Sequence, residues 1–235
     1  MEVKNKSPYL PKGKFKNLFS GLKAKTAYRV WRRKLKKYGE FNKNSVLRIL
    51  EAGCGPGYFL QCVEKWFPKA QIFGGDIDED LLQFAKEQTR RTNFLQFDAH
   101  KFPFQDGYFD VVVSFQVVEH LQKPEIFLKE ARRCLKKDGL LLFSTPNPTG
   151  IPASILGKRW QGYRYDHVSL RSPQQWRGAL KDLDFEILED GTTAFSGFKI
   201  LQIFPFALIN WIPLAIFGFF SWHKGESYVV VAKKI

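Results

Sequence analysis

The stretch Val46–Gly57, VLRILEAGCGPG, decides the fold. Apolar residues lead up to the acidic Glu51, and glycines then recur at every second position, at Gly53, Gly55 and Gly57. This pattern predicts a buried parallel strand, a sharp turn and the start of a helix. Glycine permits positive φ and lets a ligand approach the backbone closely, and the first free N–H groups of the helix face that ligand. We therefore expect a ligand to bind at this turn.

The rest of the chain alternates between predicted strands and helices. Strands are expected at residues 71–78, 93–97, 109–115, 140–144, 185–189 and 227–235, and helices at 58–67, 79–91, 124–135 and about 173–182. This order predicts an α/β fold with a parallel sheet covered by helices on both faces. Ligands of such sheets bind beyond the carboxyl ends of the strands. The aromatic and basic segment 146–171 is expected to be a loop that contacts substrate, and residues 1–12 are expected to be disordered.

The positive charge is concentrated at the beginning of the chain. Residues 1–44 hold 14 Lys or Arg and 2 Asp or Glu, whereas residues 45–235 hold 23 and 21. This distribution argues against a protein whose whole surface binds nucleic acid. It favours a basic arm that meets an anionic membrane surface or a nucleic acid. We divide the chain into a basic helical arm, residues 1–44, and a main domain, residues 45–235.

Apolar residues between positions 14 and 38 recur at steps of three and four, with basic residues between them. This spacing predicts amphipathic basic helices in the arm. Such helices either lie on an anionic bilayer or cover a pocket. The alternative is that one face packs on the core and the other is solvated.

A second apolar segment, residues 200–220, contains no charged residue. Its 21 residues could span a bilayer. However, Pro205 and Pro213 interrupt a single helix, and one crossing would separate the strand at 227–235 from its sheet. We expect an insert, residues 195–224, whose short apolar helices dip into one leaflet or cover an apolar pocket. The alternative is a hairpin buried in the core.

The cysteines and the N-terminal residues bear on localisation. Cys54, Cys62 and Cys134 are odd in number and lack the spacing of a zinc or disulfide framework, which favours a reducing compartment. No apolar signal segment precedes residue 44. We expect a cytoplasmic protein that is peripheral at a membrane.

Two further acidic residues suggest which ligand the glycine turn binds. Asp76 ends the second predicted strand, 21 residues after Gly55, where a carboxylate suits the hydroxyls of a ribose. The alternative for Asp76 is a helix cap. Asp98 ends the third strand, where it can accept from an adenine amino group, and the alternative for Asp98 is a turn residue. Tyr58 stands where a dinucleotide site would need its third glycine. Together these residues predict an adenosine pocket.

Four segments in sequence order carry a family resemblance. The segments ILEAGCGPG, GGDID, LQFDAHKFPFQDGYFDVVVSFQVVEHL and LKKDGLLLFSTPNP resemble successive motifs of the class I S-adenosylmethionine-dependent methyltransferases. The most similar group is the small-molecule branch that includes the ubiquinone and menaquinone methylases. The resemblance covers about residues 46–191 and the last strand. It implies a three-layer, Rossmann-like, seven-stranded sheet with an antiparallel last strand, and S-adenosylmethionine as cofactor.

The resemblance also implies roles for individual residues. The glycine turn and the acid before it would hold the methionine part of the cofactor, the second-strand acid the ribose, and the third-strand acid the adenine. The fourth strand would supply one residue near the methionine end. The positions in this chain are Glu51, Gly53, Gly55 and Gly57, then Asp76 with Ile77, Asp98 with Ala99, and Gln116.

The implied reaction is an in-line displacement in which a substrate oxygen, nitrogen or carbon attacks the sulfonium methyl group. A general base is needed only if that atom must lose a proton, and His120 and His167 are the candidate catalytic residues. His120 could instead make a structural hydrogen bond at a helix start, and His167 could instead contact substrate or act as a lid hinge. Some quinone O-methylases resemble this region and bind a divalent metal through an E-x-x-E-H cluster. Because Gln116 stands at the first position of that cluster here, we expect no metal.

The favoured function is methylation of a lipophilic or membrane-presented small molecule, such as a quinone precursor or a lipid. Peripheral membrane contact is expected through residues 14–38 and 200–220. The alternatives are a nucleic-acid or protein methyltransferase that uses the basic arm, and a cofactor-binding protein without catalysis. The fourth strand ends in Ser-Phe-Gln-Val and lacks the Asn/Asp-Pro-Pro-aromatic signature of amino-directed nucleic-acid methylases. Nucleic acid is therefore not the expected partner.

Overall fold

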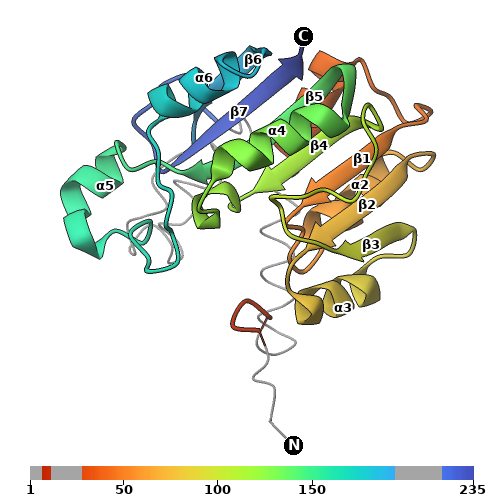
Figure 1. Ribbon diagram of the computed structural model, residues 1–235, viewed down its shortest axis with the longest axis horizontal. Helices are drawn as coiled ribbons and strands as arrows, with labels where there is room; N and C mark the ends of the chain where they lie inside the picture. The colour runs from red at the N-terminus through yellow and green to blue at the C-terminus, as the bar shows by residue number, and fades with distance from the viewer. Residues whose placement is uncertain (1–6, 12–27, 194–218) are drawn as a thin grey trace, which may run out of the picture.

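The computed structural model of the protein describes residues 7–11, 28–193 and 219–235. In this part of the chain, seven strands form one sheet in the order β3-β2-β1-β4-β5-β7-β6 (Figure 1). The strands are β1 (Arg48–Ala52), β2 (Gln71–Asp76), β3 (Thr92–Gln96), β4 (Phe109–Phe115), β5 (Leu135–Pro146), β6 (Phe185–Thr192) and β7 (Ser227–Lys234). Strands β1 to β5 are parallel, and β7 runs antiparallel between β5 and β6. The predicted seven-stranded fold is confirmed.

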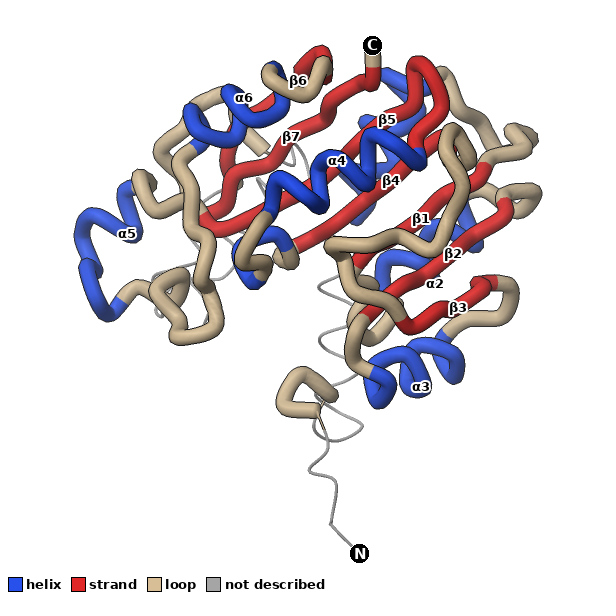
Figure 2. The backbone as a smooth tube through the Cα atoms, in the orientation of Figure 1, coloured by secondary structure: helices blue, strands red, loops and turns tan. Residues whose placement is uncertain are grey.

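Helices cover both faces of this sheet. Helices α4 and α6 lie on one face, and α2 lies on the other (Figures 1 and 2). The helices are α2 (Tyr58–Trp66), α3 (Glu79–Gln88), α4 (Pro124–Cys134), α5 (Ile151–Leu156) and α6 (Pro173–Lys181), with 3₁₀ turns η1 (Val118–His120) and η2 (Gly157–Arg159). Residues 28–39 are also helical.

The two layers of core follow from the alternation of side chains along the strands. On β4, Val111 and Val113 pack with α2, whereas Val112 between them packs with α4 and α6. Phe109 joins the layer of Val112 because the register with β5 shifts between Phe109 and Val111. Successive side chains of a strand point to opposite faces, so a strand buried on both faces is apolar at nearly every position. This is why residues 109–115 were predictable from the sequence alone.

The segment between β5 and α6 corrects one expectation. Residues 146–171 were expected to be a loop, but they contain α5 and η2. Pro152 stands in the first turn of α5, where its missing N–H costs nothing. Gly157 then ends α5 with a φ of 52°, a conformation that glycine adopts at little cost.

The described part of the basic arm packs on the core. Val30, Trp31 and Leu35 of the helix 28–39 are buried, and the Trp31 ring lies 4.8 Å from that of Phe115. Lys34 forms an ion pair with Glu189 on β6. One face of this helix is therefore packed, and its other face carries exposed basic residues. Residues 14–27 of the expected helices lie outside the described residues.

Of the expected apolar insert, residues 195–218 lie outside the described residues. The described segments on either side of this gap meet, since Thr192 pairs with Phe220 through hydrogen bonds of 2.9 Å in both directions. Among the described residues, no helix is both long and apolar enough to cross a bilayer.

We predict that Leu35→Ala lowers the free energy of unfolding by about 2–5 kcal/mol, because it empties a fully buried position between the helix 28–39 and the sheet. Urea denaturation followed by circular dichroism measures this change. The control is Lys36→Ala on the exposed face of the same helix, which should change stability by less than about 0.5 kcal/mol. Equal effects of the two substitutions would contradict the packing of this helix.

Candidate functional site

The glycine turn joins β1 to α2, and all three of its glycines have positive φ: 75° at Gly53, 49° at Gly55 and 74° at Gly57. A Cβ at Gly53 would lie 2.2 Å from a methyl group of Val117, and a Cβ at Gly57 would lie 2.9 Å from that of Ala85. At Gly55, in contrast, a Cβ would meet no described atom within 4 Å. Gly53 and Gly57 therefore allow close packing, while Gly55 faces open space that a ligand can fill.

That open space belongs to a cavity of about 620 Å³. The cavity lies beyond the carboxyl ends of β1, β2 and β4, as the topology predicts. Of the residues predicted to bind the cofactor, Gly57 alone does not line it. The residues of that set that do line it are Glu51, Gly53, Gly55, Asp76, Ile77, Asp98, Ala99 and Gln116.

Asp76 holds the glycine turn in place. One carboxylate oxygen accepts a hydrogen bond of 2.8 Å from the backbone N–H of Gly55, and the other accepts one of 3.0 Å from that of Asp78. Burial raises the pKa of Asp76, and these backbone hydrogen bonds oppose that shift. The cap of α3 is a different residue, Asp78, whose side chain accepts from the N–H groups of Asp80 and Leu81. Asp76 therefore does not cap α3.

Glu51 places a second carboxyl group beside Asp76. Its side chain is buried, and burial together with the nearby Asp76 carboxylate raises its pKa well above the usual value. Within the described residues, its Oε2 atom makes no hydrogen bond. A buried polar atom without a partner is rare in a folded protein, so this oxygen is available to a polar group of a ligand.

The far end of the cavity combines a carboxylate with apolar surface. Asp98 accepts hydrogen bonds from the backbone N–H of His100, at 2.8 Å, and from its ring, at 2.7 Å. The backbone hydrogen bond is the main cause that lowers the pKa of Asp98, so it is ionised at neutral pH. Ile77 and Ala99 add apolar surface to the lining, and the Ile77 side chain is 67% exposed. This end suits a flat ring system with an amino group.

Gln116 stands at the end of β4 with a φ of 56°, a conformation that residues other than glycine seldom adopt. Its backbone N–H donates to the Ser144 carbonyl at 2.8 Å, and its side-chain amide donates to the Ser144 hydroxyl at 3.2 Å. These bonds hold the chain where it turns from β4 into η1. Strained backbone of this kind is often found at functional sites.

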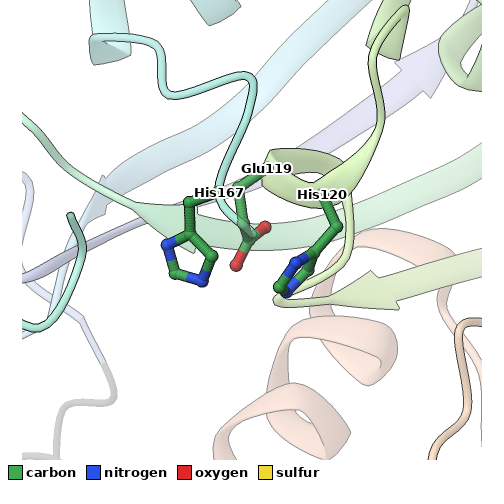
Figure 3. Close-up of side chains that lie close together, drawn as sticks. All are labelled: Glu119, His120 and His167. Atoms are coloured by element: carbon green, nitrogen blue, oxygen red, sulfur yellow. The ribbon is translucent and has the colours of Figure 1, made fainter. Parts of the chain in front are cut away.

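Next to Gln116, three side chains form a cluster that we name the Glu–His–His cluster: Glu119, His120 and His167 (Figure 3). One carboxylate oxygen and one ring nitrogen of each histidine lie within 4.8 Å of one another. The ring centroids of the histidines are 4.7 Å apart, with the planes at 84°. His120 lines the cavity, and His167 reaches the cluster from the loop after η2. The structure thus brings together the two predicted catalytic residues.

Each imidazole of the cluster is oriented by a backbone carbonyl. His120 Nδ1 lies 3.0 Å from the carbonyl oxygen of Asp166, and His167 Nδ1 lies 2.8 Å from that of Gly162. A carbonyl can only accept, so Nδ1 carries the proton and Nε2 keeps its lone pair in the neutral ring. Burial lowers the pKa of His167, which favours that neutral form. The structural bond considered for His120 is therefore present, and it leaves Nε2 available.

Glu119 is the member of the cluster that the sequence did not single out. Its side chain has no exposed surface, and neither of its oxygens has a hydrogen-bond partner of normal geometry among the described residues. Burial raises its pKa to about 7, the nearby charge of Asp166 acts in the same direction, and the Thr145 hydroxyl opposes the shift. The sequence did place Glu119 directly before His120, a candidate catalytic residue. That neighbourhood alone does not show that the Glu119 side chain is buried.

Two tyrosines of the cavity lie outside the motifs that predicted the site. Residues 7–11 were expected to be disordered, but Tyr9 lines the cavity, donates a 2.5 Å hydrogen bond to Asp166 and places its ring 6.4 Å from that of His120. Tyr28 lines the cavity as well and stacks on Phe115, with ring centroids 5.7 Å apart. The basic arm therefore supplies part of the cavity wall.

Comparison with known proteins identifies the family. A family model described as a methyltransferase domain matches residues 24–190. A Mycobacterium tuberculosis protein named "Probable S-adenosylmethionine-dependent methyltransferase" is 38% identical over 102 residues, which are 42% of this chain and 35% of that protein. The malonyl-[acyl-carrier protein] O-methyltransferase of Legionella pneumophila is 33% identical over 112 residues, 46% of this chain and 39% of the relative. The match thus spans about a third of each curated relative.

Solved structures share the fold over nearly the whole chain. The magnesium protoporphyrin IX methyltransferase of Synechocystis, solved with bound S-adenosylhomocysteine, has a TM-score of 0.65 at 16% identity, over 95% of this chain and 90% of that one. A Thermotoga maritima S-adenosylmethionine-dependent methyltransferase has a TM-score of 0.64 at 19% identity, over 94% and 96%. At such identities the likeness shows the fold alone.

The lining of the cavity fits S-adenosylmethionine. Among the described residues it offers open backbone at Gly55, a carboxyl oxygen of Glu51 without a hydrogen-bond partner, and an ionised Asp98. The family match covers most of the chain, including every strand end that lines this cavity. The protein therefore belongs to the methyltransferase domain family, and its cofactor is S-adenosylmethionine.

Proposed function

We propose that the protein transfers the methyl group of S-adenosylmethionine to a lipophilic small molecule that carries an ionisable hydroxyl group. The observation that carries this proposal is the position of the Glu–His–His cluster beside Gln116, at the border of the cofactor cavity. We also propose that the protein acts on a substrate of the kind that the ubiquinone and menaquinone methylases use.

In this proposal the cofactor lies along the carboxyl ends of the strands. Asp98 and Ala99 meet the adenine, Asp76 and Ile77 the ribose, and the open backbone at Gly55 the methionine part. The free oxygen of Glu51 faces the methionine ammonium group. The sulfonium then lies near Gln116, so that the methyl group points towards His120 and the acceptor.

The acceptor end has an aromatic wall. Tyr9, Tyr28 and Phe115 line the cavity together with His120. The Tyr9 ring lies 6.4 Å from that of His120, Tyr28 stacks on Phe115, and the Trp31 ring packs against Phe115. Aromatic side chains offer a large apolar surface with fixed geometry. An acceptor with a flat apolar body and one hydroxyl group fits this combination of aromatic wall and imidazole.

The reaction is a direct displacement. The acceptor oxygen forms a bond to the methyl carbon while the carbon–sulfur bond breaks, and its electron pair stays on sulfur as S-adenosylhomocysteine forms. The acceptor's proton passes to solvent. His120 and His167 are proposed to activate the hydroxyl group, because their Nε2 atoms are free to act on it.

The named relatives leave room for other acceptors. The Legionella relative is named for a malonyl-[acyl-carrier protein] substrate. Its aligned part covers less than half of this chain, so an acyl-carrier substrate is an outcome to be tested. Two further outcomes to be tested are methylation of nucleic acid or protein through the basic arm, and cofactor binding without catalysis.

We predict that Asp76→Ala weakens the binding of S-adenosylhomocysteine by at least about tenfold, because the side chain both holds the Gly55 turn and accepts from the ribose. Isothermal titration calorimetry measures the affinity. Asp110→Ala is the matched control, since Asp110 also accepts from a backbone N–H, that of Arg48, but near the start of β4. If Asp76→Ala binds like the wild type, the cofactor site is misplaced.

We predict that His120→Asn and His167→Asn each slow methyl transfer by at least about 100-fold while the affinity for S-adenosylhomocysteine stays within a factor of about two. The assay follows label from methyl-labelled cofactor into the organic phase of a membrane lipid extract. His223→Asn is the control, because His223 lies outside the cluster and bonds to Asp190. Label that appears only in RNA, protein or acyl-carrier fractions would replace the lipophilic acceptor by that substrate.

We also propose peripheral membrane contact through residues 14–38 and 200–220, which fits a cytoplasmic protein with a lipophilic substrate. Within the described part of this region, Arg29 and Lys36 are exposed on the helix 28–39. We predict that the full chain cosediments with anionic vesicles and that Arg29→Glu and Lys36→Glu each weaken binding by about fivefold or more, since each basic residue near such a surface contributes about 1 kcal/mol. Absence of vesicle binding, or salt-sensitive RNA binding in its place, would contradict the proposal.

A further inference from the structure

The Glu–His–His cluster has the composition and the spacing of a metal site. Its three donor atoms are two imidazole nitrogens and one carboxylate oxygen, all within 4.8 Å of one another. Two ligand atoms of one zinc ion are separated by at most about 4.2 Å, which is twice a bond of about 2.1 Å. The three atoms are therefore close to, but not yet within, the separation that one ion requires, and binding would draw them together.

The hydrogen bonds of the two histidines are those of metal ligands. A ligating imidazole normally donates its other N–H to a carbonyl or a carboxylate, which fixes the ring and leaves one lone pair for the metal. His120 and His167 each make that bond through Nδ1, to the carbonyl oxygens of Asp166 and Gly162. Both rings therefore keep an unprotonated Nε2, and both lie beside the Glu119 carboxyl group (Figure 3).

Electrostatics supply an independent argument. The Glu119 carboxyl group is fully buried, and no described residue donates a hydrogen bond of normal geometry to either of its oxygens. The charge of Arg164 acts on Glu119, but its guanidinium group is held by Asp166 through two hydrogen bonds of 3.0 Å. One nitrogen of each ring and one oxygen of this carboxyl group thus lie within 4.8 Å of one another, without a hydrogen bond of normal geometry to Glu119 among the described residues. A cation at their centre would give these atoms a partner.

We propose that Glu119, His120 and His167 bind one divalent first-row transition-metal ion at the acceptor end of the cavity. Imidazole nitrogen favours Zn²⁺, Fe²⁺ or Co²⁺ over Mg²⁺ and Ca²⁺, which prefer all-oxygen sites. Three protein ligands leave open positions on the ion. The role of those positions rests on the proposed function: they would receive the acceptor oxygen, and the ion would then activate the hydroxyl group in place of direct contact with the two Nε2 atoms. The binding of the ion itself does not depend on that function.

The sequence predicted no metal, because Gln116 stands where the E-x-x-E-H cluster has its first glutamate. The donor that completes the set, His167, lies on a loop far along the chain, and only the fold brings it to Glu119. Tyr9 contributes indirectly, since its hydroxyl holds the Asp166 side chain whose backbone carbonyl orients His120.

The test is a titration of the full-length, tag-free, chelator-treated protein with Co²⁺, followed by visible ligand-field absorption and by calorimetry. We expect one Co²⁺ per chain in the wild type and in His223→Asn. Glu119→Gln, His120→Asn and His167→Asn are expected to weaken binding by more than about tenfold. Each variant is first shown to keep its far-ultraviolet circular dichroism and its S-adenosylhomocysteine affinity, so that loss of the ion is not loss of the fold.

The outcomes separate the metal from the methyl transfer. One equivalent of Co²⁺ that depends on all three residues and is displaced by Zn²⁺ but not by Mg²⁺ supports the proposal. No binding to the wild type, or binding unchanged in the three variants, overturns it and leaves protonation of Glu119 as the way the cluster is neutralised. If methyl transfer persists in the chelator-treated protein, the ion has no part in the reaction and the histidines act on the acceptor directly. The proposed function would then stand without the metal.

Discussion

The site depends on one hydrogen bond between neighbouring strand ends, from the backbone N–H of Gly55 to the carboxylate of Asp76. β1 and β2 are already in register up to Ala52 and Gly75, and the Gly75 carbonyl also accepts from the N–H groups of Gly53 and Cys54. The bond to Asp76 is the one that extends this connection into the turn and involves a side chain of the site. It holds the glycine turn next to the end of β2. Asp76, Glu51 and the open backbone at Gly55 consequently line the same cavity. The N–H donors at the start of α2 and the acids of the strand ends then face the same ligand.

Much of this half of the protein could be predicted from the sequence because its determinants are local. The apolar run of β4 and the glycine spacing before α2 each specify their own structure within a few residues. The strand predicted at 140–144 is longer in the structure, Leu135–Pro146, because Leu135 pairs with Phe109 and Pro146 with Ser227, and such distant partners are not visible in a local pattern. The carboxyl ends of parallel strands necessarily gather at one edge, so the cofactor residues follow from the strand assignments.

The acceptor half could not be predicted in the same way, because its parts meet only through tertiary packing. Tyr9 and Tyr28 come from the arm, Glu119 and His120 from η1, and His167 from beyond η2. No local pattern shows that Glu119 has no exposed surface or that a carbonyl turns each imidazole towards it. The family resemblance has the same limit, since the match with the curated relatives covers less than half of this chain.

The pairing of Thr192 with Phe220 has a consequence for how this protein can change over evolutionary time. The pair, continued by hydrogen bonds between Thr193 and residues 226 and 227, closes the base of the excursion between β6 and β7. These bonds complete the pairing of β6 with β7 without any contribution from residues 194–218. The edge of the sheet, and with it the order of the strands that carry the cofactor site, is therefore fixed by residues on either side of that segment. Changes in the number of residues between Thr193 and Phe219 can accumulate without a change in the β6–β7 register.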